Sequence, residues 1–294
     1  MLLQTKRLQV SIPEPHTFPN TTYRFDRAGF VASVMLDGRY EFCTHEPNNL
    51  FHPSSGGVGL CNEYLFPQAC SEATIGEYFT KFGIGLFRKP DEQPFCFFKQ
   101  YDAKFFAITW KADEHSITFI TDPLPYNGYA VVQTKTLSVD QNRLTMSITL
   151  SNQGEKFLEM REFCHNFVTI DHKTLGSGYK LDIPALKDRG DAVQKGTVCG
   201  NGRGYSFSGY NSRAALINVS ANEIEDVGTF TWILRHTESP ARIRSDIDFK
   251  PDGIDLWCID HIISVEAFRS ITLNPGESTS WTRQWTFYDE LDNE

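Results

Sequence analysis

The sequence has no long apolar run and no cluster of basic residues. No segment approaches the roughly 20 apolar residues that a membrane-spanning helix needs, and residues 1–13 lack the apolar core and cleavage site of a secretory signal. The 28 Lys and Arg are outnumbered by 37 Asp and Glu, which gives a net charge of −9. Because nucleic-acid binding depends on Lys and Arg that neutralise phosphates, we expect no nucleic-acid partner. Because the long apolar run and the signal sequence are missing, we expect no membrane partner and a cytoplasmic location.

Motifs for metal binding and for nucleophilic catalysis are also missing. The seven cysteines are an odd number and form no C-x-x-C pair, which disfavours a zinc site and a disulfide framework. Neither the G-x-S-x-G motif of serine hydrolases nor a His-x-x-x-His pair occurs. We therefore predict reduced thiols and no metal.

Short alternating segments, rich in β-branched and aromatic residues, dominate what is present. Apolar residues make up 40% of the chain, which suffices for a large core. Alternation is typical of strands with one buried face, and turn sequences such as Asp140-Gln141-Asn142 separate the segments. Strands are predicted at residues 24–36, 105–110, 116–121, 129–139, 143–151, 214–220, 230–235, 256–262, 270–273 and 278–287.

This pattern predicts an all-β fold, a large antiparallel β-sandwich that forms one domain over residues 1–294. Helical periodicity is weak, with short candidates only within residues 62–78 and after Pro184. Residues 45–92 hold six glycines and four prolines, so we predict a loop-rich insert there, packed through its aromatic side chains.

Residues 160–170 place polar side chains inside an apolar run. Polar groups on a buried strand need partners, and this requirement concentrates them at clefts. In a regular strand, one face would carry Arg161, Phe163, His165 and Phe167, and the other Glu162, Cys164 and Asn166. We take Arg161, Glu162 and Asn166 as candidate ligand-binding residues and His165 as a candidate catalytic residue. A structural histidine with satisfied hydrogen bonds is the alternative for His165.

Two further polar sets lie beside aromatic residues. In the insert, Glu63, Lys81 and Arg88 are candidates for a sugar site, because sugar rings stack on aromatic faces while their hydroxyls bind charged groups. Glu63 and Lys81 are equally consistent with charges at the rim of a cleft. The set near the C-terminus consists of Trp257, Asp260, His261 and Glu266.

The order of these motifs resembles the galactose mutarotase-like (aldose 1-epimerase) superfamily. Residues 24–42 (RFDRAGFVASVMLDGRYEF) resemble its first hairpin, residues 126–171 its central strands, and residues 265–287 (VEAFRSITLNPGESTSWTRQWTF) its closing strands. The resemblance implies a supersandwich-type β-sandwich with a concave face for a small-molecule carbohydrate, and an activity that needs no cofactor.

In that family, a strand histidine acts as general acid and a late glutamate as general base in opening the sugar ring. The resemblance assigns the acid to His165. The chain lacks the family's Asn-Arg, His-Gly-Gly and Leu-Glu-Thr-Gln motifs, so the base stays open: Glu266 is the first candidate, Asp260 the second and Glu63 the third.

We therefore predict an aldose 1-epimerase-like isomerase that interconverts the anomers of a sugar. A non-catalytic carbohydrate-binding protein on the same scaffold is the first alternative. A polysaccharide lyase or hydrolase is the second, because related sandwiches host such chemistry. The sequence identifies neither the sugar nor the oligomeric state.

Overall fold

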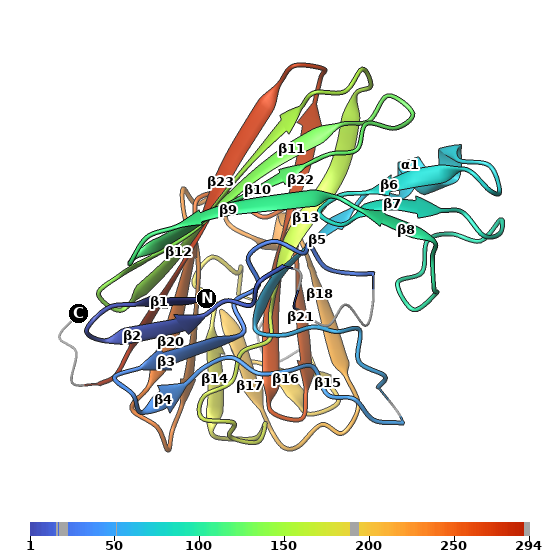
Figure 1. Cartoon of the computed structure of the whole chain (residues 1–294). Coiled ribbons are helices and arrows are strands. Elements are labelled where there is room, and N and C mark those ends of the chain that lie inside the picture. Colours follow the sequence, from blue (N-terminus) through green and yellow to red (C-terminus); the bar gives the residue numbers. More distant parts are fainter. Residues whose placement is uncertain (16, 18–22, 51, 189–193, 291–294) are drawn as a thin grey trace.

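The computed structural model describes residues 1–294 except 16, 18–22, 51, 189–193 and 291–294 (Figure 1). Antiparallel sheets make up nearly all of the described chain, which confirms the all-β prediction. The helical elements there are α1 (Pro67–Glu72), with Pro67 in the first turn where its missing N–H costs no hydrogen bond, and a 3₁₀ turn, η2 (Ala221–Glu223). No helix in the described ranges is long and apolar enough to cross a membrane.

The largest sheet has eleven strands and runs the length of the molecule (Figure 1). The hairpin of β11 (Val131–Asp140) and β12 (Arg143–Asn152) lies toward one edge of this sheet, and buried and half-buried residues alternate along both strands as the sequence pattern predicts. In spatial order the strands are β15 (Gln194–Lys195), β16 (Val198–Gly200), β17 (Gly204–Phe207), β14 (Tyr179–Asp182), β19 (Phe230–His236), β20 (Arg242–Ile247), β23 (Ser278–Tyr288), β12 (Arg143–Asn152), β11 (Val131–Asp140), β10 (Ser116–Asp122) and β9 (Ala107–Ala112).

A five-stranded sheet forms the second layer, and two small sheets flank the pair. The five strands, in spatial order, are β18 (Ala215–Ser220), β21 (Gly253–Ile259), β22 (Ile262–Leu273), β13 (Leu158–Asn166) and β5 (Leu60–Leu65). The small sheets comprise β1 (Leu2–Gln4), β2 (Leu8–Ser11), β3 (Ser33–Leu36) and β4 (Tyr40–Glu41), and β6 (Tyr78–Lys81), β7 (Gly85–Arg88) and β8 (Ala103–Phe105).

The two large sheets are joined across the core by a chain of buried charged and amide groups. Lys135 Nζ on β11 contacts Asp26 Oδ2 at 2.5 Å and donates to Asn62 Oδ1 on β5 at 2.8 Å. Asn62 Nδ2 donates to Glu162 Oε1 on β13 at 2.6 Å, and Arg283 on β23 donates to the same carboxylate at 2.8 and 3.1 Å. Each of the four charged side chains in this buried network contacts one of opposite charge, as a buried charge requires.

Four local predictions differ from the structure. Residues 45–92 are mostly loop only up to residue 59, since β5, α1, β6 and β7 follow. Gly85 marks a close approach of strands rather than a loop, because a Cβ there would lie 2.3 Å from the Lys104 carbonyl oxygen. The predicted strand 256–262 is broken by a turn in which Asp260 has a φ of 57°, and no helix is found in the described residues after Pro184 apart from η2. Within residues 24–36, only Ser33–Leu36 forms a strand.

Candidate active site

The outer face of the five-stranded sheet carries a cavity of about 330 Å³. Strand side chains alternate between the two faces of a sheet, so residues two apart line the same face. All five strands contribute: Leu216 from β18, Asp255 and Trp257 from β21, Glu266 and Phe268 from β22, Phe163 and His165 from β13, and Glu63 and Leu65 from β5. Phe167 follows β13, and Arg24, Glu46, His52 and Phe97 come from loops.

His165 and Glu266 meet where the backbone ladder between β13 and β22 opens. The regular pairing of the two strands stops after Glu162 and resumes at Val168 in the same register. In that register His165 lies directly opposite Glu266, so their side chains are cross-strand neighbours on the outer face. The antiparallel topology therefore brings together two residues that are 101 positions apart (266 − 165).

Two side chains replace the missing ladder hydrogen bonds in this gap. Asn166 Nδ2 donates to the Val265 carbonyl at 2.7 Å, and the Asn166 backbone N–H donates to Ser264 Oγ at 3.0 Å. Ser264 Oγ in turn donates to Glu266 Oε1 at 2.9 Å. The orientation of the Glu266 carboxylate is thus fixed by the hydroxyl of Ser264, which is fully buried.

The imidazole of His165 lies between two carboxylates. Its Nε2 is 3.1 Å from Glu63 Oε2, and its Nδ1 is 2.8 Å from Glu266 Oε1. The second contact is an ion pair and not a hydrogen bond, because the carboxylate lies off the direction of the Nδ1–H bond. The Phe167 ring stacks on the imidazole at 5.3 Å, and the side chain of His165 is only 3% exposed.

These contacts shift the pKa values of His165 and Glu63 in opposite directions. Burial and the Arg24 charge act to lower the pKa of His165, but the Glu266 carboxylate beside Nδ1 and the hydrogen bond to Glu63 outweigh them and raise it above 6.5. Burial acts to raise the pKa of Glu63, but Arg24, His165 and Lys81 together lower it from 4.5 to about 2. Each shift favours the charged form of its group, so the pair favours an imidazolium beside a carboxylate.

The free energy of unfolding should depend on pH through this pair. The raised pKa of His165 gives stabilisation that is complete below pH 6.5 and is lost as the pH rises through the folded-state value. The lowered pKa of Glu63 gives stabilisation that is complete above pH 4.5 and is lost as the pH falls toward 2. Denaturant titrations of the wild type and of Glu63→Gln over this range measure the loss of stability at high pH and at low pH. If the free energy of unfolding fell by the same amount in both proteins at both ends of the range, the pKa assignments would be wrong.

Loop residues supply two further charged groups to the cavity wall. Arg24 Nε donates to Glu63 Oε2 at 2.8 Å, and the Arg24 guanidinium lies over the Phe97 ring at 4.6 Å. Glu46, which is buried, lies 2.9 Å from His52 Nε2. The sequence did not predict a role for any of the four loop residues, because nothing local marks a loop residue as part of a site formed by distant strands.

The structure brings together four of the predicted site residues: Glu63, His165, Trp257 and Glu266 all line the cavity. Arg161 is exposed, with its guanidinium 4.0 Å from the centre of the Phe268 ring, which places it at the rim.

Four other candidates lie outside this cavity. Glu162 and Asn166 point to the inner face, where Glu162 binds Arg283 and the Asn166 side chain binds backbone carbonyls, so neither lines the site. Arg88 is exposed and donates to the Gly76 carbonyl, and Asp260 lies in the turn after β21, 3.1 Å from the neighbouring His261. Asp260 is therefore not supported as the base. Lys81 borders the site, 3.9 Å from Glu63 Oε1.

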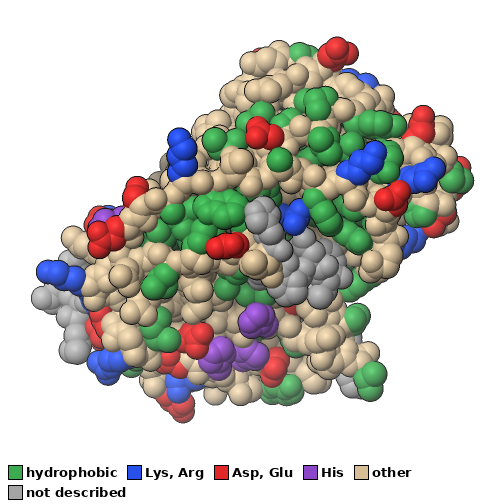
Figure 2. Space-filling model, in the orientation of Figure 1, with side chains coloured by type: hydrophobic (Ala, Val, Ile, Leu, Met, Phe, Trp, Pro, Cys, Tyr) green, Lys and Arg blue, Asp and Glu red, His purple; other side chains and the backbone are tan. Residues whose placement is uncertain are grey.

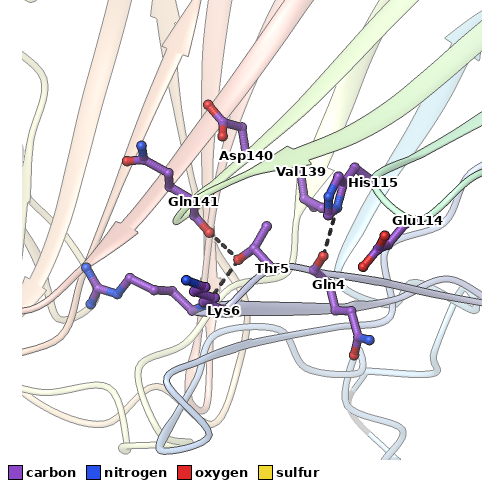
Figure 3. Close-up of a pocket in the computed structure, with 9 residues that line it drawn as sticks. Gln4, Thr5, Lys6, Glu114, His115, Val139, Asp140 and Gln141 are labelled. Atoms are coloured by element: carbon purple, nitrogen blue, oxygen red, sulfur yellow. Dashed lines mark hydrogen bonds between the residues drawn. The ribbon is translucent and has the colours of Figure 1, made fainter.

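A second hollow, of about 760 Å³, lies between the turn that joins β1 to β2 and the turns that follow β9 and β11 (Figure 3). Its polar contacts hold the backbone together: Thr5 Oγ1 donates to the Gln141 carbonyl, and His115 Nδ1 lies 3.1 Å from the Gln4 carbonyl. The His115 imidazole forms no ion pair with a carboxylate among the described residues, so this hollow lacks the acid–base pairing of the first cavity.

The described residues offer no metal site, and one face of the molecule shows no basic patch. No group of three His, Cys, Asp or Glu side chains within the described residues is arranged to hold a metal ion. On the face shown in Figure 2, Lys and Arg side chains are scattered among Asp and Glu and do not gather in a basic patch.

Solved structures similar to this one share one fold. No protein-family model matches the chain, and no curated protein matches it. A galactose mutarotase related enzyme from Lactobacillus acidophilus superposes with a TM-score of 0.61 at 12% sequence identity, over 99% of this chain and 98% of that one. A galactose mutarotase-like protein from Clostridium acetobutylicum superposes with a TM-score of 0.62 at 11% identity, over 98% and 94% of the two chains.

The likeness extends to an animal protein. A GalM/aldose epimerase homologue from C. elegans superposes with a TM-score of 0.55 at 10% identity, over 98% of both chains. At these identities the superpositions establish the fold of the chain and leave its activity to be argued from its own residues. The chain has the galactose mutarotase-like fold, as its sequence motifs predicted.

Proposed function

We propose that the chain is an aldose 1-epimerase-like enzyme that interconverts the anomers of a free sugar. The observation that supports this most strongly is the contact of His165 with Glu266 at 2.8 Å on the wall of a cavity that can hold one sugar ring. A protonated imidazole and a carboxylate are the two groups that acid–base opening of a hemiacetal needs, and neither requires a cofactor. Phe163, Phe167 and Trp257 offer aromatic faces to the apolar side of the ring.

In the proposed reaction, Glu266 takes the proton from the anomeric hydroxyl while the bond between C1 and the ring oxygen breaks. The electron pair of that bond goes to the ring oxygen, which receives the proton of His165. The sugar is then an open-chain aldehyde, and rotation about the C1–C2 bond presents its other face to the hydroxyl that recloses the ring. Reclosure returns each proton to its donor, so the enzyme is unchanged.

Glu63 has a supporting part in this mechanism. Its lowered pKa keeps it anionic across the neutral range, so it holds the imidazolium charge on His165 between turnovers. Arg24 and Lys81 balance the Glu63 charge. A free oxygen of Glu63 can also accept a hydrogen bond from a sugar hydroxyl.

A non-catalytic carbohydrate-binding protein is the second candidate, and one observation favours it. Both ring nitrogens of His165 already contact carboxylates, which suits a histidine that only fixes the shape of the cavity. No contact in the described residues favours a polysaccharide lyase or hydrolase over these two.

Polarimetry of a freshly dissolved single anomer of glucose or galactose, with and without the protein, decides between the two candidates. An enzyme accelerates the change in optical rotation in proportion to its concentration. A sugar-binding protein gives the uncatalysed rate while titration calorimetry still detects binding, and that result would replace the enzyme proposal.

Replacing Ser264 with Ala should lower kcat more than it changes KM. Loss of the Ser264 hydroxyl removes a hydrogen bond that orients Glu266 but no group that contacts the sugar. Because one oriented carboxylate is loosened rather than lost, we expect a decrease of about 3- to 30-fold in kcat. Initial rates over a range of sugar concentrations measure it, with Ser264→Thr as the variant that keeps the hydroxyl. An unchanged kcat in Ser264→Ala would show that Ser264 does not position Glu266.

A further inference from the structure

A cavity of about 680 Å³, here called the second cavity, adjoins the cavity that holds His165 and Glu266 and meets it at Glu63. It is distinct from the hollow shown in Figure 3. The two cavities share Glu63, Leu65 and Phe97 as wall residues. The second cavity lies under α1 and the β6–β7 hairpin, and its wall is rich in aromatic side chains. They are Tyr64, Phe66, Phe79, Phe95 and Phe97.

Two buried lysines line this second cavity. Lys81, 5% exposed, donates through Nζ to the Tyr64 carbonyl at 2.6 Å, and its ammonium lies 5.2 Å from the centre of the Phe95 ring. Lys89, 6% exposed, donates to the carbonyls of Cys70 and Ala73 at 3.0 and 2.7 Å. Lysine side chains are seldom this buried without an acidic partner.

Neither ammonium has a carboxylate of its own among the described residues. The carboxylate nearest to Lys81 is that of Glu63, at 3.9 Å, and Glu63 is engaged more closely by Arg24 at 2.8 Å and His165 at 3.1 Å. Lys89 has no described carboxylate within the 4.0 Å of an ion pair. Burial lowers the pKa of Lys81, as expected for an ammonium whose charge is incompletely compensated.

The two cavities therefore differ in how their charges are arranged. The first holds four carboxylates, those of Glu46, Glu63, Asp255 and Glu266, beside the Arg24 guanidinium and the His165 imidazole. The second holds two buried ammonium groups, with Glu63 at the boundary and Glu92 exposed at its edge. A ligand that spans both would have hydroxyls at one end and negative charge at the other. An ammonium group has three N–H donors, so each lysine keeps at least one beyond those it gives to backbone carbonyls.

We propose that the second cavity binds an anionic substituent, a phosphate or a carboxylate, of the aldose whose anomeric carbon lies in the first cavity. This inference rests on the proposed function and adds the substrate class. The substituent lies away from C1, because anomer exchange needs a free hydroxyl there. Lys81 contacts it at the boundary of the cavities and Lys89 from the far wall, while the aromatic side chains exclude water and strengthen both interactions.

Wild-type protein provides the first test, which needs no variant. Calorimetry and anomer-exchange rates are compared for glucose, glucose 6-phosphate and glucuronate, with the galactose series alongside. A charge-assisted hydrogen bond in a water-excluded site is worth about a factor of 10 or more in affinity. We expect at least one anionic sugar to bind about 10-fold more tightly than its neutral parent, and added salt to reduce that difference. The phosphate and carboxylate arms identify which group is preferred.

Lys89→Met and Lys89→Arg provide the second test. The Met variant should lose the preference for the anionic sugar and keep the KM of the neutral sugar, and the Arg variant, which keeps the charge, should restore the preference. Equal affinity of the wild type for neutral and anionic sugars would overturn the inference. A Lys89→Met variant with an unchanged preference would also overturn it, since Lys89 would then only stabilise the end of α1. Tighter binding of neutral disaccharides than of anionic sugars would replace it with a second sugar subsite.

These outcomes are distinguishable from failure of the proposed function. If no sugar shows accelerated anomer exchange, the enzyme proposal fails, and the calorimetric comparison still decides the charge preference of the second cavity.

Discussion

Replacement of His165 by Gln is expected to reduce kcat for anomer exchange by about 10²- to 10⁴-fold, which is the range for loss of a general acid. Gln keeps a similar volume and an N–H that can still reach Glu63, but it carries no proton that can be given to the ring oxygen. The imidazole touches the carboxylates of Glu63 and Glu266, which favour its protonated form. Polarimetric rates at saturating sugar measure the decrease.

His172→Gln is the matched control. His172 is half exposed, pairs with Glu41 at 3.0 Å and does not line the cavity. Its variant should retain the wild-type rate, while sugar binding by His165→Gln should persist. A His165→Gln protein that is folded and as fast as the wild type would remove His165 from the mechanism.

Replacement of Lys135 by Met is expected to reduce the free energy of unfolding by about 3–5 kcal/mol, the cost of leaving one member of a buried ion pair without its partner. The ammonium contacts Asp26, and both side chains are almost completely buried. It also donates to the Ala28 carbonyl and to Asn62, which links the eleven-stranded and five-stranded sheets. Denaturant unfolding at neutral pH measures the loss.

Lys111→Met, an exposed lysine on β9, is the control and should change stability by less than about 0.5 kcal/mol. The double variant Asp26→Asn, Lys135→Met should recover part of the loss, because no uncompensated charge then stays in the core. A Lys135→Met protein as stable as the wild type would show that the buried network contributes no net stability.

The sequence predicted the long strands whose two faces differ, and it missed β5, which is buried on both faces, as well as the short alternating strands β2 and β20. Alternation predicted β11 and β12 to within two residues at each end. It failed for β5, where five consecutive residues are buried and no alternation exists to be read. The glycines and prolines around β5 then favoured a loop.

The candidate site was predictable in part for a similar reason. Parity along β13 correctly separated Phe163 and His165 from Glu162 and Asn166, although Glu162 and Asn166 had been taken as ligand-binding residues. The contact between His165 and Glu266 depends on the register of β13 against β22. This register is a non-local property that one sequence does not reveal.

The sequence could not predict which loop residues line the cavity. Arg24, Glu46 and His52 join the cavity only because their loops fold back over the outer face of the five-stranded sheet. No periodicity places a loop side chain, so the charges that set the pKa values of Glu63 and His165 could not be assembled from the sequence.

The central claim is that His165 and Glu266 act together on one hemiacetal. Exchange NMR of equilibrated glucose and galactose, and of their anionic derivatives, gives the anomer-exchange rate for the wild type, His165→Gln, Glu266→Gln and the double variant. Groups that act as a unit give non-additive losses. We expect the double variant to be no more than a few-fold slower than either single variant. Losses that multiply, or a wild type that leaves the uncatalysed rate unchanged for every sugar, would contradict the account.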